Sequence, residues 1–326
     1  MDDFIICGDC QSRASLSDAL CHAPEAKAIL GDHAALWDFE IGVDLFTLPF
    51  FFLHTRDFFS DHDCEIADTQ KIFNVMVNKK LEHRYLTLRL IQYFGLREFA
   101  YTYSGSCKNI NDQNIFLDLD LCDPKRQMFS PELMMQILGD VTLAPNFLGL
   151  DSYDYLSEAV KNGSVTYNGN YLAWKTALNQ IFSSTLISLV TESDNGDYDR
   201  VTVFTEKTIY ALLGLTIPIW PGGYKHAEMF ERMGFDVFPD LIDHSYQNEP
   251  TMFMRCWRAF KDNLDLLNHD LLTAKKIRND IMPRLVSNRD YLLSEQLQNW
   301  YHEQMSTWPC GIREAVYKRF KQLRTR

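Results

Sequence analysis

Three consecutive residues, Thr205, Glu206 and Lys207, have side chains suited to binding a diphosphate. Thr205 is a favoured N-cap residue, and the residues after it predict a helix over 206–213. The first turn of a helix offers free N–H groups and the positive end of the helix dipole, which attract phosphate. We therefore expect Lys207 to contact a diphosphate and Glu206 to accept hydrogen bonds from ribose or sugar hydroxyls. The alternative is that Glu206 only complements the helix dipole.

Two further features fall where predicted strands end. The strand predicted at 185–191 runs into Glu192, and the strand predicted at 217–220 runs into a turn at Gly222-Gly223. In parallel α/β sheets, ligands bind beside the carboxyl ends of the strands. Glu192 would then accept hydrogen bonds from a ribose or sugar, and the two glycines would let the backbone approach the ligand. An ordinary tight turn is the alternative for the glycines.

These positions depend on alternating strands and helices in the second half of the chain. After the strand at 217–220, a helix is predicted to end at Gly234, and another strand is predicted at 235–238. Strand, helix, strand, helix, strand indicates a parallel sheet with helical crossovers. From about residue 249 the chain is predicted to be helical to its end, with Pro283 and Pro309 as breaks.

A similar unit precedes this one. Buried strands are predicted at 73–77 and 99–103, with a helix over 84–94 between them. At the start of that helix, Arg84 would neutralise a leaving diphosphate, and His83 would be a catalytic base. A surface loop is the alternative for this pair.

Other polar residues offer a second base or a metal site. Asp9 follows an apolar strand predicted at 4–6 and is a candidate base by position alone. The metal-binding alternatives are Asp118-Leu119-Asp120 with Asp123, Asp61-His62-Asp63, and Cys7 and Cys10 with Cys21-His22. No second cysteine pair with zinc-ligand spacing follows, and Asp-X-Asp occurs often by chance. We therefore expect reduced cysteines, no metal and no cofactor.

Composition sets the class of protein. The chain has 326 residues, 46% of them hydrophobic and only 15 glycines, which excludes disordered and collagen-like classes. At roughly 150 residues per domain, the length indicates two domains, placed at 1–175 and 176–326. The formal net charge is −12, but residues 311–326 hold six basic residues against one acid. This basic end predicts a solvated last helix or, alternatively, a phosphate-binding patch.

The first residues and the apolar runs bear on location. The chain opens with Met-Asp-Asp and lacks the positive segment of a signal peptide. Its most apolar run, residues 45–53, contains a proline and is shorter than the roughly 20 residues of a membrane span. We therefore expect a cytoplasmic protein with no membrane span.

Several stretches resemble the α1,3-fucosyltransferase family and related nucleotide-sugar glycosyltransferases. In order, these are FNVMVNKKLEHRYLTLRLIQYFGL, LISLVTES, FTEK, the strand and turn IPIWPGG, and RMGFDVFPDLIDHSY. The first stretch and the whole run from Leu186 to Tyr246, which holds the others, together cover about a quarter of the chain. The family shows an apolar strand ending in Glu, an acidic loop, Thr-Glu-Lys, a helix, a short strand containing proline and a glycine turn.

The resemblance implies the GT-B architecture, an α/β fold of two Rossmann-like domains with parallel sheets. The C-terminal domain would bind the nucleotide-sugar donor and the N-terminal domain the acceptor. Position by position, Lys207 would contact the diphosphate, and Glu192 and Glu206 the ribose or sugar. The family's Asn after the first Glu is Ser193 here, and its Tyr two positions before Thr-Glu-Lys is Val203. Because of these departures, no particular donor sugar is predicted.

The sequence thus predicts a metal-independent glycosyltransferase that moves a sugar from a nucleotide diphosphate to an acceptor hydroxyl. A glycan or small acceptor is favoured, and a hydroxymethylated base in DNA is the alternative, since the basic end suits DNA but the acidic remainder does not. A non-catalytic nucleotide-sugar-binding protein is the other alternative.

Overall fold

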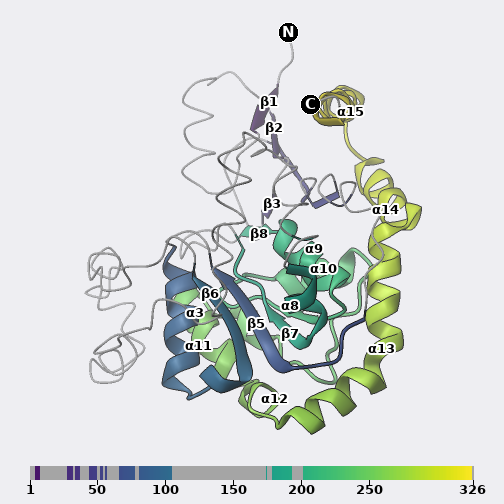
Figure 1. The fold of residues 1–326 in the computed structure, drawn as a ribbon. Coiled ribbons are helices and arrows are strands. Elements are labelled where there is room, and N and C mark those ends of the chain that lie inside the picture. Colours follow the sequence, from purple (N-terminus) through teal and green to yellow (C-terminus); the bar gives the residue numbers. More distant parts are fainter. Residues whose placement is uncertain are drawn as a thin grey trace, which may run out of the picture.

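The computed structural model describes residues 4–7, 28–31, 34–36, 44–49, 52–53, 56, 66–77, 81–104, 174, 178–192 and 201–324. The fold is mixed α/β, as predicted, and it is built around a four-stranded sheet in the order β6-β5-β7-β9 (Figure 1). All neighbouring strands of this sheet are parallel. The strands are β5 (Lys71–Val77), β6 (Ala100–Ser104), β7 (Thr185–Leu189) and β9 (Ile217–Ile219). Each confirms a predicted strand to within about two residues.

The two central strands, β5 and β7, are apolar runs buried on both faces, as expected for a parallel sheet covered by helices. A buried polar network fixes how they pair. Asn74 donates its side-chain amide to the Thr185 hydroxyl at 2.7 Å and to the Ser188 hydroxyl at 2.9 Å. The Ser188 hydroxyl in turn bonds to that of Thr216, beside β9, at 2.8 Å. A shift of register would leave these buried groups unpaired, so the network specifies the sheet.

The sheet corrects the predicted domain boundary at 175/176. Strands β5 and β6 come from before this boundary, and β7 and β9 come from after it. The physical reason is the position of β5, which is central and has two edges to pair. Strand β6 satisfies one edge and β7 the other. The unit that holds the candidate site therefore begins upstream of β5, not at residue 176.

Helices join and cover these strands. Helix α3 (Glu82–Tyr93) connects β5 to β6, and α9 (Glu206–Leu213) precedes β9. Helix α3 packs against α11 (Met252–Lys261), and the two lie side by side in Figure 1. The 23-residue α13 (Leu271–Leu293) contacts β5, β7 and α9. The remaining helical elements are α8 (Asn179–Ser183), η2 (Arg97–Phe99), α10 (His226–Arg232), η4 (Ser245–Asn248), α12 (Leu264–Leu267), α14 (Glu295–Met305) and α15 (Cys310–Arg324).

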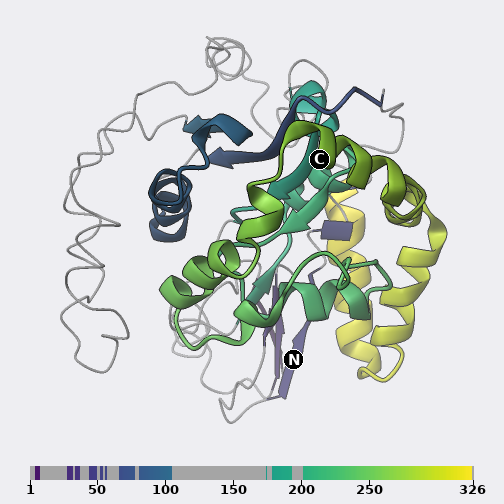
Figure 2. The same ribbon diagram turned by 90° about the horizontal axis from the view of Figure 1, so that it is seen from below.

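Strands near the N-terminus form two smaller sheets. Strands β1 (Phe4–Cys7), β2 (Ala28–Gly31) and β4 (Asp44–Thr47) are parallel, in the order β1-β2-β4. Strand β3 (Ala34–Leu36) pairs antiparallel with β8 (Val201–Val203). Of these five strands, the sequence predicted only β1. Figure 2, seen from below, shows the helices α13 and α14 as one flank of the molecule.

Residues 235–238, predicted as a strand, do not form one. Asn288 of α13 accepts a hydrogen bond from the Asp236 N–H and donates one to the Asp236 carbonyl, both at 2.8 Å. Phe238 has a left-handed φ of 54°, and its N–H is bound by the Asp236 carboxylate. These bonds take the backbone groups that a neighbouring strand would need.

The predicted helical C-terminal part is confirmed, but only one of its two proline breaks. Pro309 lies between α14 and α15, as predicted. Pro283 instead lies inside α13. The helix continues through it because Ile281 and Leu285, on either side, are buried in the core against the sheet. Tertiary packing here outweighs the helix-breaking tendency of proline.

Among the described helices, none combines the length and apolar character that a membrane span requires.

Candidate functional site

The buried carboxylate of Glu192 lies at the centre of the candidate site. Glu192 follows β7 by three residues and is fully buried. One carboxylate oxygen accepts the Thr205 N–H at 3.0 Å and the Thr208 hydroxyl at 2.6 Å. The other oxygen accepts the Thr205 hydroxyl. Glu192 therefore fixes the first turn of α9 against the carboxyl end of β7.

The start of α9 is as predicted. Thr205 is the N-cap residue, with an extended backbone, and its hydroxyl accepts the Lys207 N–H at 3.4 Å. The Lys207 ammonium donates to a Glu206 carboxylate oxygen at 2.9 Å and to the Thr205 hydroxyl at 3.2 Å. The Lys207 and Glu206 side chains are 15% and 19% exposed. This cation is therefore held at a helix N-terminus while it stays within reach of solvent.

His83 and Arg84 reach the same point from the neighbouring strand. They lie in the first turn of α3, directly after β5, and both are buried. The His83 Nε2 is 2.9 Å and the Arg84 Nη2 3.0 Å from the backbone carbonyl oxygen of Glu192. Because β5 and β7 are adjacent and parallel, their carboxyl ends bring the first turns of α3 and α9 together. The surface-loop alternative for this pair is therefore wrong.

The surroundings of His83 do not suit the predicted role of catalytic base. A carbonyl can only accept, so Nε2 carries the proton and donates it to Glu192. Burial, assisted by the charges of Arg84 and Lys207, lowers the pKa of His83 to about 3. A general base works best with a pKa near the working pH. His83 is thus a neutral hydrogen-bond donor that positions the end of β7.

The two glutamates differ in their electrostatics. Burial raises the pKa of Glu192, and the Lys207 charge and the threonine hydrogen bonds oppose this rise. For Glu206, burial also acts to raise the pKa, but the charge and hydrogen bond of Lys207 outweigh it and the pKa is lowered. Glu206 is thus ionised at neutral pH. The Glu192 carboxylate already accepts three protein hydrogen bonds, so Glu206 is the better placed of the two for ligand hydroxyls.

The glycine turn after β9 allows a close approach, but to protein groups. Gly222 has a left-handed φ of 79°, and a β-carbon on it would lie 3.0 Å from Cys256 Sγ. A β-carbon on Gly223 would lie 2.6 Å from Nδ1 of His226. The buried Arg255 also donates to the Gly222 carbonyl at 2.7 Å. The space beside both glycines, where side chains would lie, is therefore filled by protein groups and not by the predicted ligand.

Two residues of the site were not predicted from the sequence. Thr208 adds a second hydroxyl to Glu192, and the Trp220 indole N–H donates to Thr208 at 3.0 Å. The available signal was the spacing Thr205-x-x-Thr208, which places two hydroxyls on the first turn of one helix. The hydrogen bond from Trp220 to Thr208 depends on where β9 ends relative to α9. No local pattern in the sequence predicts that position.

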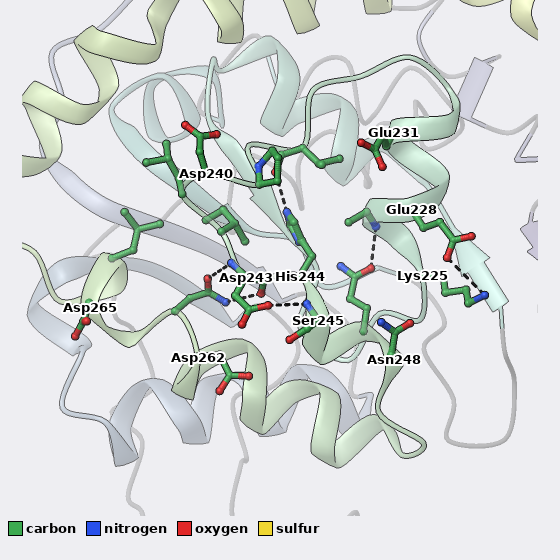
Figure 3. Close-up of a pocket in the computed structure, with 18 of the residues that line it drawn as sticks. Lys225, Glu228, Glu231, Asp240, Asp243, His244, Ser245, Asn248, Asp262 and Asp265 are labelled. Carbon is green, nitrogen blue, oxygen red and sulfur yellow. Dashed lines mark hydrogen bonds and ion pairs between the residues drawn. The ribbon is translucent and has the colours of Figure 1, made fainter.

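A separate pocket of about 780 Å³ lies between α10, the segment 237–248 and α12 (Figure 3). None of the predicted site residues lines it. Six carboxylates line it: Glu228, Glu231, Asp240, Asp243, Asp262 and Asp265. The basic side chains in the lining are Lys225, His244 and His269. Figure 3 shows several of these carboxylates around the opening, and Glu228 pairs with Lys225 at 3.5 Å. An acidic lining repels phosphate, so this pocket does not suit a diphosphate.

Several predicted residues cannot be placed. Asp9 and the metal alternatives at Cys10, Cys21-His22, Asp61-His62-Asp63, Asp118, Asp120 and Asp123 lie outside the described residues. Within the described ranges, no group of three or more His, Cys, Asp or Glu residues lies close enough to hold a metal ion.

The geometry therefore brings His83, Arg84, Glu192 and the first turn of α9 to one edge of a parallel sheet. A cation, a helix N-terminus and an ionised carboxylate there can bind a ligand that carries both phosphate and hydroxyl groups. No family model, no curated protein and no solved structure matches the chain.

Proposed function

We propose that this protein is a glycosyltransferase that moves a sugar from a nucleotide-diphosphate donor to an acceptor hydroxyl. One observation carries the proposal: Lys207, Arg84 and the first turn of α9 gather at the carboxyl edge of a parallel sheet. This is the position at which α/β proteins bind nucleotides. The resemblance of the same residues to the α1,3-fucosyltransferase family supports a sugar as the transferred group.

In this proposal the protein acts mainly on the leaving group. The Lys207 ammonium holds the diphosphate at the positive end of the α9 dipole, and Arg84 adds positive charge beside it. Positive groups fixed in place stabilise the negative charge that grows on the diphosphate as the sugar leaves. Glu206 accepts hydrogen bonds from ribose or sugar hydroxyls.

We propose a GT-B arrangement with a revised division of the chain. The four-stranded sheet with its helices is the donor-binding unit and starts near residue 66. The parallel sheet β1-β2-β4 supports a second Rossmann-like unit, which would bind the acceptor. Asp9 is the second residue after β1 in the sequence and stays the candidate base.

A non-catalytic nucleotide-sugar-binding protein is the second candidate. The observation that favours it is the lowered pKa of His83, which removes one of the two candidate bases. The two functions differ in turnover and not in binding, so both predict affinity for a nucleoside diphosphate.

The test is a calorimetric titration of the purified chain with UDP, GDP, CMP, ADP and dTDP, with and without Mg²⁺. Selective binding of one nucleoside diphosphate supports the site and identifies the donor class. The matching nucleotide sugars are then assayed for release of the nucleotide. Binding with no release under any condition supports the non-catalytic candidate, and no binding at all contradicts both.

The acceptor is tested separately. A glycan or small acceptor stays the favoured one, and the observation that supports the DNA alternative is the basic helix α15, with Arg313, Lys318, Arg319, Lys321 and Arg324. Transfer of a radiolabelled sugar to hydroxymethylated DNA, compared with unmodified DNA and with simple sugars, distinguishes the two.

A further inference from the structure

A hydrogen-bond chain with a fixed direction runs through the first turn of α9. An ammonium group can only donate, so the Thr205 hydroxyl accepts from Lys207 at 3.2 Å. The same hydroxyl also accepts the Lys207 N–H, so its own proton is left to donate to Glu192. The chain therefore runs from Lys207 through Thr205 to Glu192.

A second chain reaches the same carboxylate from β9. The Trp220 indole N–H can only donate, so the Thr208 hydroxyl accepts it at 3.0 Å and donates to Glu192 at 2.6 Å. Thr208 thus donates a hydrogen bond to Glu192 as Thr205 does, but it accepts its own hydrogen bond from Trp220 and not from Lys207. The two threonines form a matched pair for experiment.

From these contacts we infer that Thr205 and Glu192 are positioning residues, which hold the Lys207 ammonium at the place where a diphosphate binds. Thr205 and Glu206 take two of the three ammonium protons, which leaves the third for a phosphate oxygen. This inference rests on the proposed function for the identity of the ligand. The geometry of the hydrogen-bond chain from Lys207 to Glu192 does not depend on any ligand.

Holding the Lys207 ammonium in place before a ligand arrives favours binding. A lysine side chain has four flexible carbons and loses much rotamer freedom when its ammonium is fixed. Ordering it before the ligand arrives removes that loss from the binding step. The buried Glu192 and the backbone of α9 supply the rigid support, since Glu192 is fully buried and binds both the N–H and the hydroxyl of Thr205.

The first test needs no ligand. Acetylation of Lys207 by an N-hydroxysuccinimide ester is followed by mass spectrometry in the wild type, Thr205→Val, Thr205→Ser and Thr208→Val. We expect Thr205→Val to speed the labelling several-fold, and Thr205→Ser, which keeps the hydroxyl, to restore the wild-type rate. Thr208→Val should leave the rate unchanged. Equal rates in Thr205→Val and the wild type, or equal increases in both valine variants, would overturn the inference.

The second test uses inorganic pyrophosphate as the probe, measured by calorimetry. Thr205→Val should weaken its binding about tenfold, the scale of one hydrogen bond to a charged group, and Thr208→Val by much less. In a Lys207→Met background, Thr205→Val should have no further effect, because the ammonium that it positions is gone. A full additional loss in that background would show that Thr205 acts on its own.

The two tests separate failure of this inference from failure of the proposed function. If the wild type binds neither pyrophosphate nor any nucleoside diphosphate, the proposed function is wrong. The labelling rates still decide whether the hydrogen bonds from Lys207 through Thr205 to Glu192 hold the ammonium. Melting temperatures show whether each variant folds. If Thr205→Val does not fold, Glu192→Gln replaces it, because an amide at this place offers a donor where the chain needs an acceptor. Labelling of Lys207 should then speed up, and an unchanged rate counts against the inference.

Discussion

His83 leaves no open space for a β-carbon on Gly222, although the two residues follow different strands of the sheet. A β-carbon on Gly222 would lie 3.2 Å from the β-carbon of His83, closer than almost all natural contacts of this kind. His83 lies in the first turn of α3, after β5, and Gly222 lies in the turn after β9. The turn after β9 therefore comes close to the histidine that binds the Glu192 carbonyl.

Replacing Gly222 by alanine should therefore destabilise the protein. The left-handed φ of 79° alone costs a non-glycine residue about 1–2 kcal/mol, and the contacts with His83 and Cys256 add to it. We expect the free energy of unfolding, measured in urea, to fall by roughly 2–4 kcal/mol. The control is Gly95→Ala, which also has a left-handed φ, of 68°, but open space around it. Equal losses in the two variants would show that the contact with His83 is not tight.

The two buried histidines of the site should make stability depend on pH. Burial lowers the pKa of both His83 and His226 to about 3, below the unfolded value of about 6.5. Between these values the unfolded chain binds protons that the folded protein does not. Stability is therefore complete above about pH 6.5 and falls as the pH falls, by up to about 1.4 kcal/mol per pH unit for each histidine.

The variant His83→Gln tests this prediction, because its amide can still donate to the Glu192 carbonyl. Urea unfolding at pH 7, 6 and 5 should show a shallower loss of stability in His83→Gln than in the wild type. Parallel curves for the two proteins would mean that His83 titrates normally in the folded state, and its proposed neutral role would be wrong.

Removing the Lys207 ammonium should weaken diphosphate binding. A charge-assisted hydrogen bond contributes about 1.5–3 kcal/mol, so Lys207→Ala should raise the Kd for the preferred nucleoside diphosphate by roughly one to two orders of magnitude. The control is Lys275→Ala, which removes a partly exposed lysine paired with Asp68. An unchanged affinity in Lys207→Ala would remove this residue from the site.

Pro283 should be a point at which the protein can be stabilised. It is exposed, lies inside α13 and interrupts the backbone hydrogen bonds of that helix. Proline in a helix interior is about 3 kcal/mol less favourable than alanine, so Pro283→Ala should raise the free energy of unfolding by roughly 1–3 kcal/mol. Pro309→Ala, at the break before α15, should give no such gain. A lower melting temperature for Pro283→Ala would mean that α13 has adapted its shape to the proline.

Local patterns in the sequence were enough to predict the strands of the main sheet and the first turn of α9. The apolar runs of β5 and β7 and the Thr205 N-cap depend on neighbouring residues alone. Such features are set by side-chain period and capping chemistry, which are written in short segments.

The errors all involve contacts between distant segments. Residues 235–238 lose their strand character to Asn288, some fifty positions further along. The boundary at 175/176 failed because β5 pairs with a strand far downstream. His83 was given the wrong role because its burial and its bond to Glu192 depend on how three strands are assembled. Sequence spacing identified the side chains of the candidate site, and only the assembled sheet shows which of them are buried against protein groups and which stay within reach of solvent.

The pairing of β5 with β7 has a consequence for how the chain is made. Asn74 and Thr185, which hydrogen-bond across that pair, are 111 residues apart. At a synthesis rate of about 5–20 residues per second, β5 leaves the ribosome roughly 5–20 seconds before its partner. During that interval one edge of an apolar central strand lacks its native neighbour and can pair with other nascent chains. The protein is thus expected to depend on chaperones while it is being synthesised, and to express poorly when the chain is cut between the two strands.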